Sequence, residues 1–129
     1  MPQRLVVSRE MAALLGVLAH PHRVRIVEEL RTGELDVNSL QDILAVSHSR
    51  VSQHLSVLRS HRIVTERREG RHVYYRLVHP ALAKWLVDGL VFLSQGQQLS
   101  QEIRDAVDAT VQMWGSPTTE PLPAETKIG

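Results

Sequence analysis

Apolar side chains recur every three or four positions up to about residue 60, which is the spacing of one face of an α-helix. The pattern predicts four helices, over about residues 9–19, 21–32, 39–45 and 48–60. Pro21 suits the first turn of the second helix, where the N–H that it lacks would be unpaired anyway. Asn38 with Gln41 has the spacing of a capping box for the third helix, and Ser47 can cap the fourth. Val37 is expected in a short extended segment before the third helix.

After residue 62, the spacing of apolar residues changes from the three or four positions of a helix to the two positions of a strand. The runs 63–69 and 72–77 are strand-like and are joined around a glycine, which predicts a β-hairpin. Val73, Tyr75 and Leu77 alternate with polar or larger neighbours, so one face of the second strand should pack inward.

A second helical region is predicted from Pro80 to about residue 114. Its apolar stripe runs along Leu82, Trp85, Leu86, Leu90, Leu93, Leu99, Ile103, Val107 (or Ala106), Val111 (or Thr110) and Trp114. Gly96 interrupts the stripe, so both one bent helix and two separate helices fit the pattern. Residues 115–129 contain three prolines and are expected to form a disordered tail.

The formal net charge of +1 conceals an uneven distribution of charged residues. Between Ser47 and Arg76, seven arginines stand against only Glu66 and Glu69, whereas acidic residues are in excess from Ser94 onward. Arginine makes up 13 of the 15 basic residues, and its guanidinium forms bidentate bonds to phosphate and guanine. The distribution therefore indicates a basic face for nucleic acid in the middle of the chain.

The predicted helix 48–60 and the hairpin after it have the properties of a DNA-contacting unit. The helix has a polar outer face, as entry into a major groove requires, and the arginine-rich hairpin tip suits phosphates or a minor groove. The predicted DNA-binding residues are Ser47, His48, Ser49, Arg50, Ser52, Gln53, His54, Arg67, Arg68, Arg71 and His72. Among them, Gln53 can pair with adenine and Arg50 with guanine or phosphate. The alternative is a capped, solvated helix and a solvated turn in which Glu66 and Glu69 pair with the arginines.

The terminal helices are too apolar to be covered easily by the small helical core of a chain of 129 residues. Packing of two copies would cover these helices, and the alternative is a helix that folds back on its own domain. A homodimer would also present two DNA-reading helices to a palindromic site, one turn of DNA apart. The residues expected at the dimer interface are Met11, Leu14, Leu15, Leu86, Leu90, Leu93, Leu99 and Ile103.

The order of these elements resembles that of the ArsR/SmtB-type bacterial repressors. The matching segments are Leu18-Ala-His-Pro-His-Arg-Val-Arg-Ile-Val, Gly33-Glu-Leu-Asp-Val-Asn-Ser-Leu, Ser47-His-Ser-Arg-Val-Ser-Gln-His-Leu-Ser-Val-Leu and Arg68-Glu-Gly-Arg-His-Val-Tyr-Tyr-Arg-Leu. The match covers roughly residues 9–95. The resemblance implies a homodimeric transcriptional repressor that leaves its operator when it binds an inducer, often a metal ion.

The positions that match the family's usual metal ligands carry other residues. Where many members have cysteines for soft metals, this chain has Asp36 and Asn38. Where other members bind zinc-like ions between the terminal helices, the matching residues are His79, Ala81, Phe92 and Gln95. Only the first of these can bind a metal, so neither of the two family sites carries over.

Seven histidines leave a metal site of another kind open. His20 and His22 flank a proline, the others are scattered, and no two have the i, i+4 spacing on a predicted helix that would indicate a zinc site. His20 stands where a helix cap would help. A site at the dimer interface that uses His79 or Asp88 with a ligand from the partner chain remains an alternative. The residues alone therefore predict no metal ligands and no cofactor.

Several classes of function are excluded or disfavoured by what the chain lacks. It has no cysteine, which excludes disulfides, thiolate ligands and thiol redox sensing. No apolar run reaches the roughly 20 residues of a membrane span, and the apolar stretch at the start is too short for a signal peptide. The sequence has no glycine-rich phosphate loop, and its pattern does not bring a serine, a histidine and an aspartate together as a catalytic triad, so catalysis is not expected. We expect a cytoplasmic protein that is not an enzyme and has no contact with membranes.

The main hypothesis is a mainly α-helical winged helix-turn-helix protein with a β-hairpin wing, which dimerises through its terminal helices. Residues 1–114 would form this domain, with residues 115–129 as the tail. It would repress transcription as a homodimer on double-stranded DNA and be released by an unidentified signal. One alternative is a metal-responsive repressor with a rearranged His/Asp site, and another is a winged-helix module that docks a protein partner. An apolar inducer could also bind beside the aromatic residues Trp85, Phe92 and Trp114.

Overall fold

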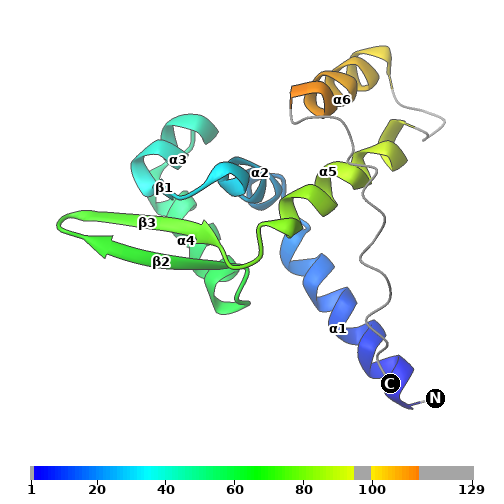
Figure 1. The fold of residues 1–129 in the computed structure, drawn as a ribbon, viewed down its shortest axis with the longest axis horizontal. Coiled ribbons are helices and arrows are strands. Elements are labelled where there is room, and N and C mark those ends of the chain that lie inside the picture. The colour runs from blue at the N-terminus through cyan, green and yellow to red at the C-terminus, as the bar shows by residue number, and fades with distance from the viewer. Residues whose placement is uncertain (1, 95–99, 114–129) are drawn as a thin grey trace. The chain divides into compact units, whose positions relative to one another are not determined.

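The computed structural model describes residues 2–94 and 100–113. The elements are α1 (Pro2–Leu18), α2 (Pro21–Glu29), the 3-10 helix η1 (Leu30–Thr32), β1 (Leu35–Asp36), α3 (Val37–Leu44), α4 (His48–Ser60), β2 (Val64–Glu69), β3 (His72–Leu77), α5 (Ala81–Ser94) and α6 (Gln101–Met113). The chain divides into two compact units, Met1–Leu86 and Val87–Gly129. The mainly helical fold with a hairpin wing confirms the predicted fold class (Figure 1).

The core of the first unit lies among α2, α3 and α4, which contact one another pairwise. Ile26 of α2, Leu40 of α3 and Leu55 of α4 are fully buried, because each belongs to the apolar face of its helix. The end of α1 adds Leu18, and the first turn of α5 adds Ala83. The buried apolar residues of α2 and α4 are therefore the positions whose helical spacing predicted these helices.

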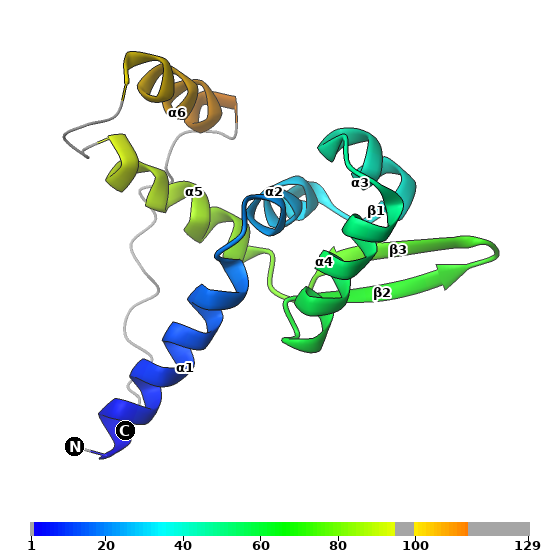
Figure 2. The ribbon, with the colours of Figure 1, turned by 180° about the vertical axis from the view of Figure 1, so that it is seen from behind.

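Three antiparallel strands, in the order β1-β3-β2, form a small sheet. The predicted hairpin is confirmed: β2 pairs with β3 from Val64 opposite Leu77 to Glu69 opposite His72. Its tight turn uses Gly70 at φ +60°, a left-handed conformation that glycine adopts without strain. Strand β1, which was not predicted as a strand, pairs with the other edge of β3. The hairpin extends beyond the helices of this unit (Figures 1 and 2).

Helix α1 begins at Pro2 instead of residue 9. Its first turns contain the consecutive apolar residues Leu5, Val6 and Val7, which have no helical period and therefore gave no periodic signal. All three are more than half exposed. Helix α1 is therefore longer than predicted, and its additional turns carry exposed apolar side chains.

Two predicted helix ends are also corrected. The N-cap of α3 is Asp36 rather than Asn38: its Oδ1 accepts a hydrogen bond from the Ser39 backbone N–H at 2.9 Å. Val37 is consequently the first residue of α3 and not part of an extended segment. The second predicted helix ends at Glu29 and continues as the 3-10 turn η1 up to Thr32.

The described part of the predicted region 80–114 contains two helices, α5 and α6. Leu99, Trp114 and the predicted tail 115–129 lie outside the described residues. None of the helices in the described part of the chain has the length and hydropathy that a bilayer span requires.

Candidate nucleic-acid interface

Helix α4 is anchored on one side and open on the other. Ser47 caps it as predicted, with its Oγ accepting a hydrogen bond from the Arg50 backbone N–H at 3.3 Å. Val51, Leu55 and Leu58 are fully buried, and the helix contacts α2, α3 and β2 through this face. The fixed apolar face leaves the remaining side of the first two turns available for a ligand.

The predicted DNA-binding residues of α4 fall into two groups by exposure. Ser52 and His54 are half-buried, whereas the exposed ones are Ser47, His48, Ser49, Arg50 and Gln53. The exposed group offers hydroxyl, amide, imidazole and guanidinium groups in one short stretch, the donor and acceptor types that bind base edges and phosphates.

His54 engages helix α2. Its Nδ1 accepts a hydrogen bond from Arg23 Nε at 3.2 Å, and its ring centroid lies 4.3 Å from that of His20. Burial lowers the pKa of His54 below its ordinary value, and the neighbouring His20 and Arg23 lower this pKa further. The lowered pKa therefore favours the neutral form of His54.

The three predicted wing arginines differ in their surroundings. Arg67 forms ion pairs with Glu34 and with Glu69, and its guanidinium lies 4.6 Å from the centre of the Tyr74 ring. The bonds to the two carboxylates raise the pKa of Arg67 above its ordinary value. Arg68 and Arg71 are exposed and form no ion pair with any residue that the structure describes. Of the three predicted wing arginines, Arg68 and Arg71 are thus the ones available to phosphates.

A link that the sequence did not reveal joins the wing to α4. Glu66 of β2 accepts a hydrogen bond from Arg59 of α4 at 2.7 Å and another from the Tyr75 hydroxyl of β3 at 3.1 Å. The connecting turn is closed by a hydrogen bond from the Ile63 N–H to the Leu58 carbonyl at 3.0 Å. Glu66 therefore connects the hairpin to α4, in addition to the direct contact between α4 and β2.

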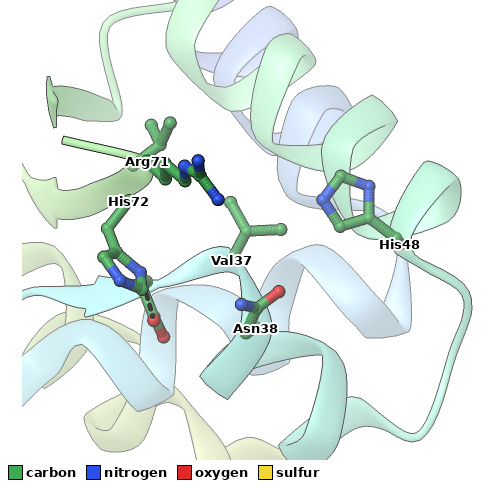
Figure 3. Close-up of a pocket in the computed structure, with 7 residues that line it drawn as sticks. Val37, Asn38, His48, Arg71 and His72 are labelled. Atoms are coloured by element: carbon green, nitrogen blue, oxygen red, sulfur yellow. Dashed lines mark ion pairs between the residues drawn. The ribbon is translucent and has the colours of Figure 1, made fainter.

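A small pocket lies where the wing, α3 and α4 meet. Figure 3 shows Arg71 and His72 on one side and His48 on the other, with the first turn of α3 between them. His72 Nδ1 is 3.7 Å from Asp36 Oδ2, and hydrogen bonds from Ser39 hold the pKa of the Asp36 carboxyl below its usual value. The fold thus brings His48 of α4 next to Arg71 and His72 of the wing, although more than 20 positions separate them in the sequence. All three are predicted DNA-binding residues. Asp36 and Asn38, which line the same pocket, were not among the predicted site residues.

The predicted dimer residues are only partly covered. Met11, Leu15, Leu93 and Ile103 each expose between 45% and 49% of their surface. Leu14 and Leu86 are half-buried and pack on the core of the first unit, and Leu90 is also half-buried. Leu99 lies outside the described residues. The chain therefore exposes large apolar side chains on α1, α5 and α6, of which Phe92, at 74%, is the most exposed.

The sequence matches known bacterial regulators over the region just described. The profile of a family described as "Bacterial regulatory protein, arsR family" matches residues 20–66, from the start of α2 into β2. The transcriptional repressor SmtB homolog of Synechocystis is 44% identical over 70 residues, which cover 54% of this chain and 53% of that protein. The chain thus spans about half the length of this relative.

Two further comparisons cover more of the known protein. The biofilm growth-associated repressor of Agrobacterium fabrum is 40% identical over 83 residues, which cover 64% of this chain and 70% of the relative. The crystal structure of the transcriptional repressor BigR from Xylella fastidiosa matches with a TM-score of 0.60 at 34% identity, covering 76% of this chain and 98% of that one. With the capped helix, the wing and these matches together, the chain belongs to the arsR family of bacterial regulatory proteins, a family of DNA-binding transcriptional regulators.

Proposed function

We propose that this protein represses transcription by binding a palindromic operator as a homodimer, with α4 of each copy in the major groove. The observation that carries the proposal is the exposed polar start of α4 beside a wing in which Arg68 and Arg71 pair with no described carboxylate. The family is one of regulatory proteins rather than of enzymes. We place the repressor in the cytoplasm, where the DNA that it would bind is found.

Within this proposal, α4 reads sequence and the wing supplies affinity. Gln53 is suited to adenine and Arg50 to guanine, because each can form two parallel hydrogen bonds to its base. Ser47 lies at the helix N-terminus, where backbone N–H groups and the helix dipole favour a phosphate. Arg71 shares a pocket with His48, so a phosphate could be bound from both the wing and the helix.

The exposed apolar surface supports the homodimer. Met11 and Leu15 repeat at helical spacing on α1, and both are about half exposed. Exposed apolar patches on a protein of this size usually mark an interface. Sedimentation equilibrium at micromolar concentration should give twice the chain mass of 14.6 kDa. A mass of one chain under those conditions would contradict the dimer.

The experiment that tests the function is selection of duplexes from a random DNA pool, followed by fluorescence anisotropy. We expect a palindromic sequence to be enriched and to bind on the order of a thousandfold or more tighter than a scrambled duplex. Two half-sites should recur about 10 base pairs apart, one turn of DNA. Failure to enrich any sequence, or equal affinity for both duplexes, would refute a sequence-specific repressor.

Replacing Arg68 and Arg71 with alanine should weaken binding to the selected and the scrambled duplex alike. Each substitution removes one phosphate contact from each copy of the homodimer, so the slope of log affinity against log salt should fall by about 2 per substituted position. Titrations between 50 and 200 mM salt measure this slope. Arg25→Ala is the matched control, because Arg25 is an arginine on α2 that already pairs with Glu29 at 3.0 Å. Loss of sequence preference without a change in slope would instead assign Arg68 and Arg71 to base reading.

A further inference from the structure

Three histidines converge where the start of α2 meets α4. His20 is the N-cap of α2, His22 lies in the first turn of that helix, and His54 is on α4. The ring centroids are 5.2 Å apart for His20 and His22, 4.3 Å for His20 and His54, and 5.5 Å for His22 and His54. All three residues are half-buried, and one nitrogen of each ring lies within 4.8 Å of the other two.

Three converging imidazoles are the ligand set of a transition-metal ion. Imidazole suits zinc, nickel and cobalt, and a site with three protein ligands keeps a position for water. With metal–nitrogen distances of about 2.0–2.1 Å, the ligand nitrogens of a tetrahedral site lie roughly 3.3 Å apart. The observed nitrogens, which lie within 4.8 Å of one another, therefore have to approach by up to about 1.5 Å to hold an ion.

One ring nitrogen of the cluster lacks the partner that a purely structural role would provide. His22 Nδ1 is buried and forms no hydrogen bond with any residue that the structure describes. A buried polar atom without a partner is unusual, because its desolvation is not offset. A metal ion bound to His22 Nδ1 would give this atom a partner.

We propose that His20, His22 and His54 form a binding site for one divalent transition-metal ion. The site lies at the junction of α2 and α4, away from both positions where the family resemblance leads one to look for ligands. Its ligands come from two segments that are more than 30 positions apart in the sequence, so the site exists only in the folded chain.

Binding of an ion would change the hydrogen bonds that now occupy this junction. The Nδ1 atoms of His20 and His54 accept hydrogen bonds from the His22 backbone N–H, at 3.1 Å, and from Arg23 Nε, at 3.2 Å. In a neutral imidazole that accepts at Nδ1, the proton is on Nε2. If the ion binds Nδ1 of such a ring, it displaces the hydrogen-bond donor from that atom. If the ion binds Nε2, the ring proton must move to Nδ1, which can then no longer accept the hydrogen bond. Both routes break the present hydrogen bond.

Binding of the ion would break the hydrogen bond from Arg23 to His54. The positive charge of the ion would also repel the guanidinium of Arg23. Arg23 also donates to the Val17 carbonyl at 3.0 Å, so it now connects the end of α1 with α4. His54 is adjacent in sequence to Gln53, the residue proposed to read adenine. The ion would therefore alter the seating of the DNA-reading helix, a consequence that rests on the proposed function.

Metal binding is tested without DNA, by titrating the metal-free full-length protein with Co²⁺ and following the visible absorption of the bound ion. We expect one ion per chain. His22→Ala should weaken binding at least as much as the roughly 10–100-fold that loss of an outer-shell partner causes in metal sites, and His54→Gln should act likewise. His48→Ala and His61→Ala are the matched controls, because both histidines are exposed and lie outside the cluster.

Circular dichroism of each variant excludes loss of the fold as the cause of weaker binding. His22 is the preferred position, since its side chain donates and accepts no hydrogen bond that the structure records, whereas His20 caps α2. Absence of stoichiometric binding by the wild type would overturn the site. So would unchanged binding by His22→Ala, or loss of binding in either control.

A second titration separates this proposal from the proposed function. The affinity for the selected duplex is measured without metal and with one equivalent of Zn²⁺, for the wild type and His22→Ala. A change of about tenfold or more in the wild type alone supports the link from the ion to α4. Metal binding without any DNA binding would refute the function and leave the site standing, and DNA binding without metal binding would do the reverse.

Discussion

Leu55→Ala is expected to lower the free energy of unfolding by about 2–5 kcal/mol. Leu55 is fully buried on the face of α4 that packs against α2, α3 and β2. The substitution removes buried apolar atoms and leaves a cavity among helices that are fixed by their other contacts. Urea denaturation followed by circular dichroism measures the loss.

Ser56→Ala is the matched control for this prediction, because Ser56 is the next residue of α4 and is exposed. Its effect should stay within about 0.5 kcal/mol. All proteins must be compared at one concentration, since dimerisation would make the apparent stability depend on concentration. A loss of less than about 1 kcal/mol for Leu55→Ala would show that α4 is not held by this face.

Gln53→Ala and Arg50→Ala should each cost about 1–3 kcal/mol for every half-site of the selected duplex and blur the preference at one base pair in each half-site. Both side chains are exposed, so the variants should unfold at the same urea concentration as the wild type. The loss arises because the alanine side chain cannot form the two parallel hydrogen bonds to a base edge. Anisotropy titrations with single-base variants of the duplex locate the position that each residue reads.

Arg25→Ala again serves as the control, because it removes the same charge from a different helix. It should leave the order of affinities among the duplex variants unchanged. If Gln53→Ala and Arg50→Ala retain wild-type affinity and preference, α4 is not the helix that reads the sequence.

Elements with a strong local signal could be predicted from the sequence. The buried face of α4 follows from the spacing of Val51, Leu55 and Leu58, and Ser47 caps this helix as its residue type indicates. The hairpin follows from a change of period around Gly70. These features depend on residues within one or two turns of each other, and the predicted family followed from the same segments.

Features that depend on packing between distant segments could not be predicted in this way. Nothing in the spacing of His20 and His54 indicates that their rings meet, because the contact exists only once α2 lies against α4. Arg67 was predicted to face phosphates, and no pattern showed that Glu34, 33 positions earlier, would pair with it. The choice of Asp36 over Asn38 as the cap of α3 likewise depended on where β1 ends.

The bond from Glu66 to both Arg59 and Tyr75 has a consequence for the kind of DNA that fits. Because these bonds and the packing of α4 on β2 connect helix and wing, the protein surface loses less conformational entropy on binding and adapts less readily to a duplex of different groove width or curvature. The deformation then falls on the DNA, and its energy depends on how readily each base step bends. Sequence preference should therefore extend to base pairs between the half-sites that no side chain touches, with flexible pyrimidine–purine steps favoured there.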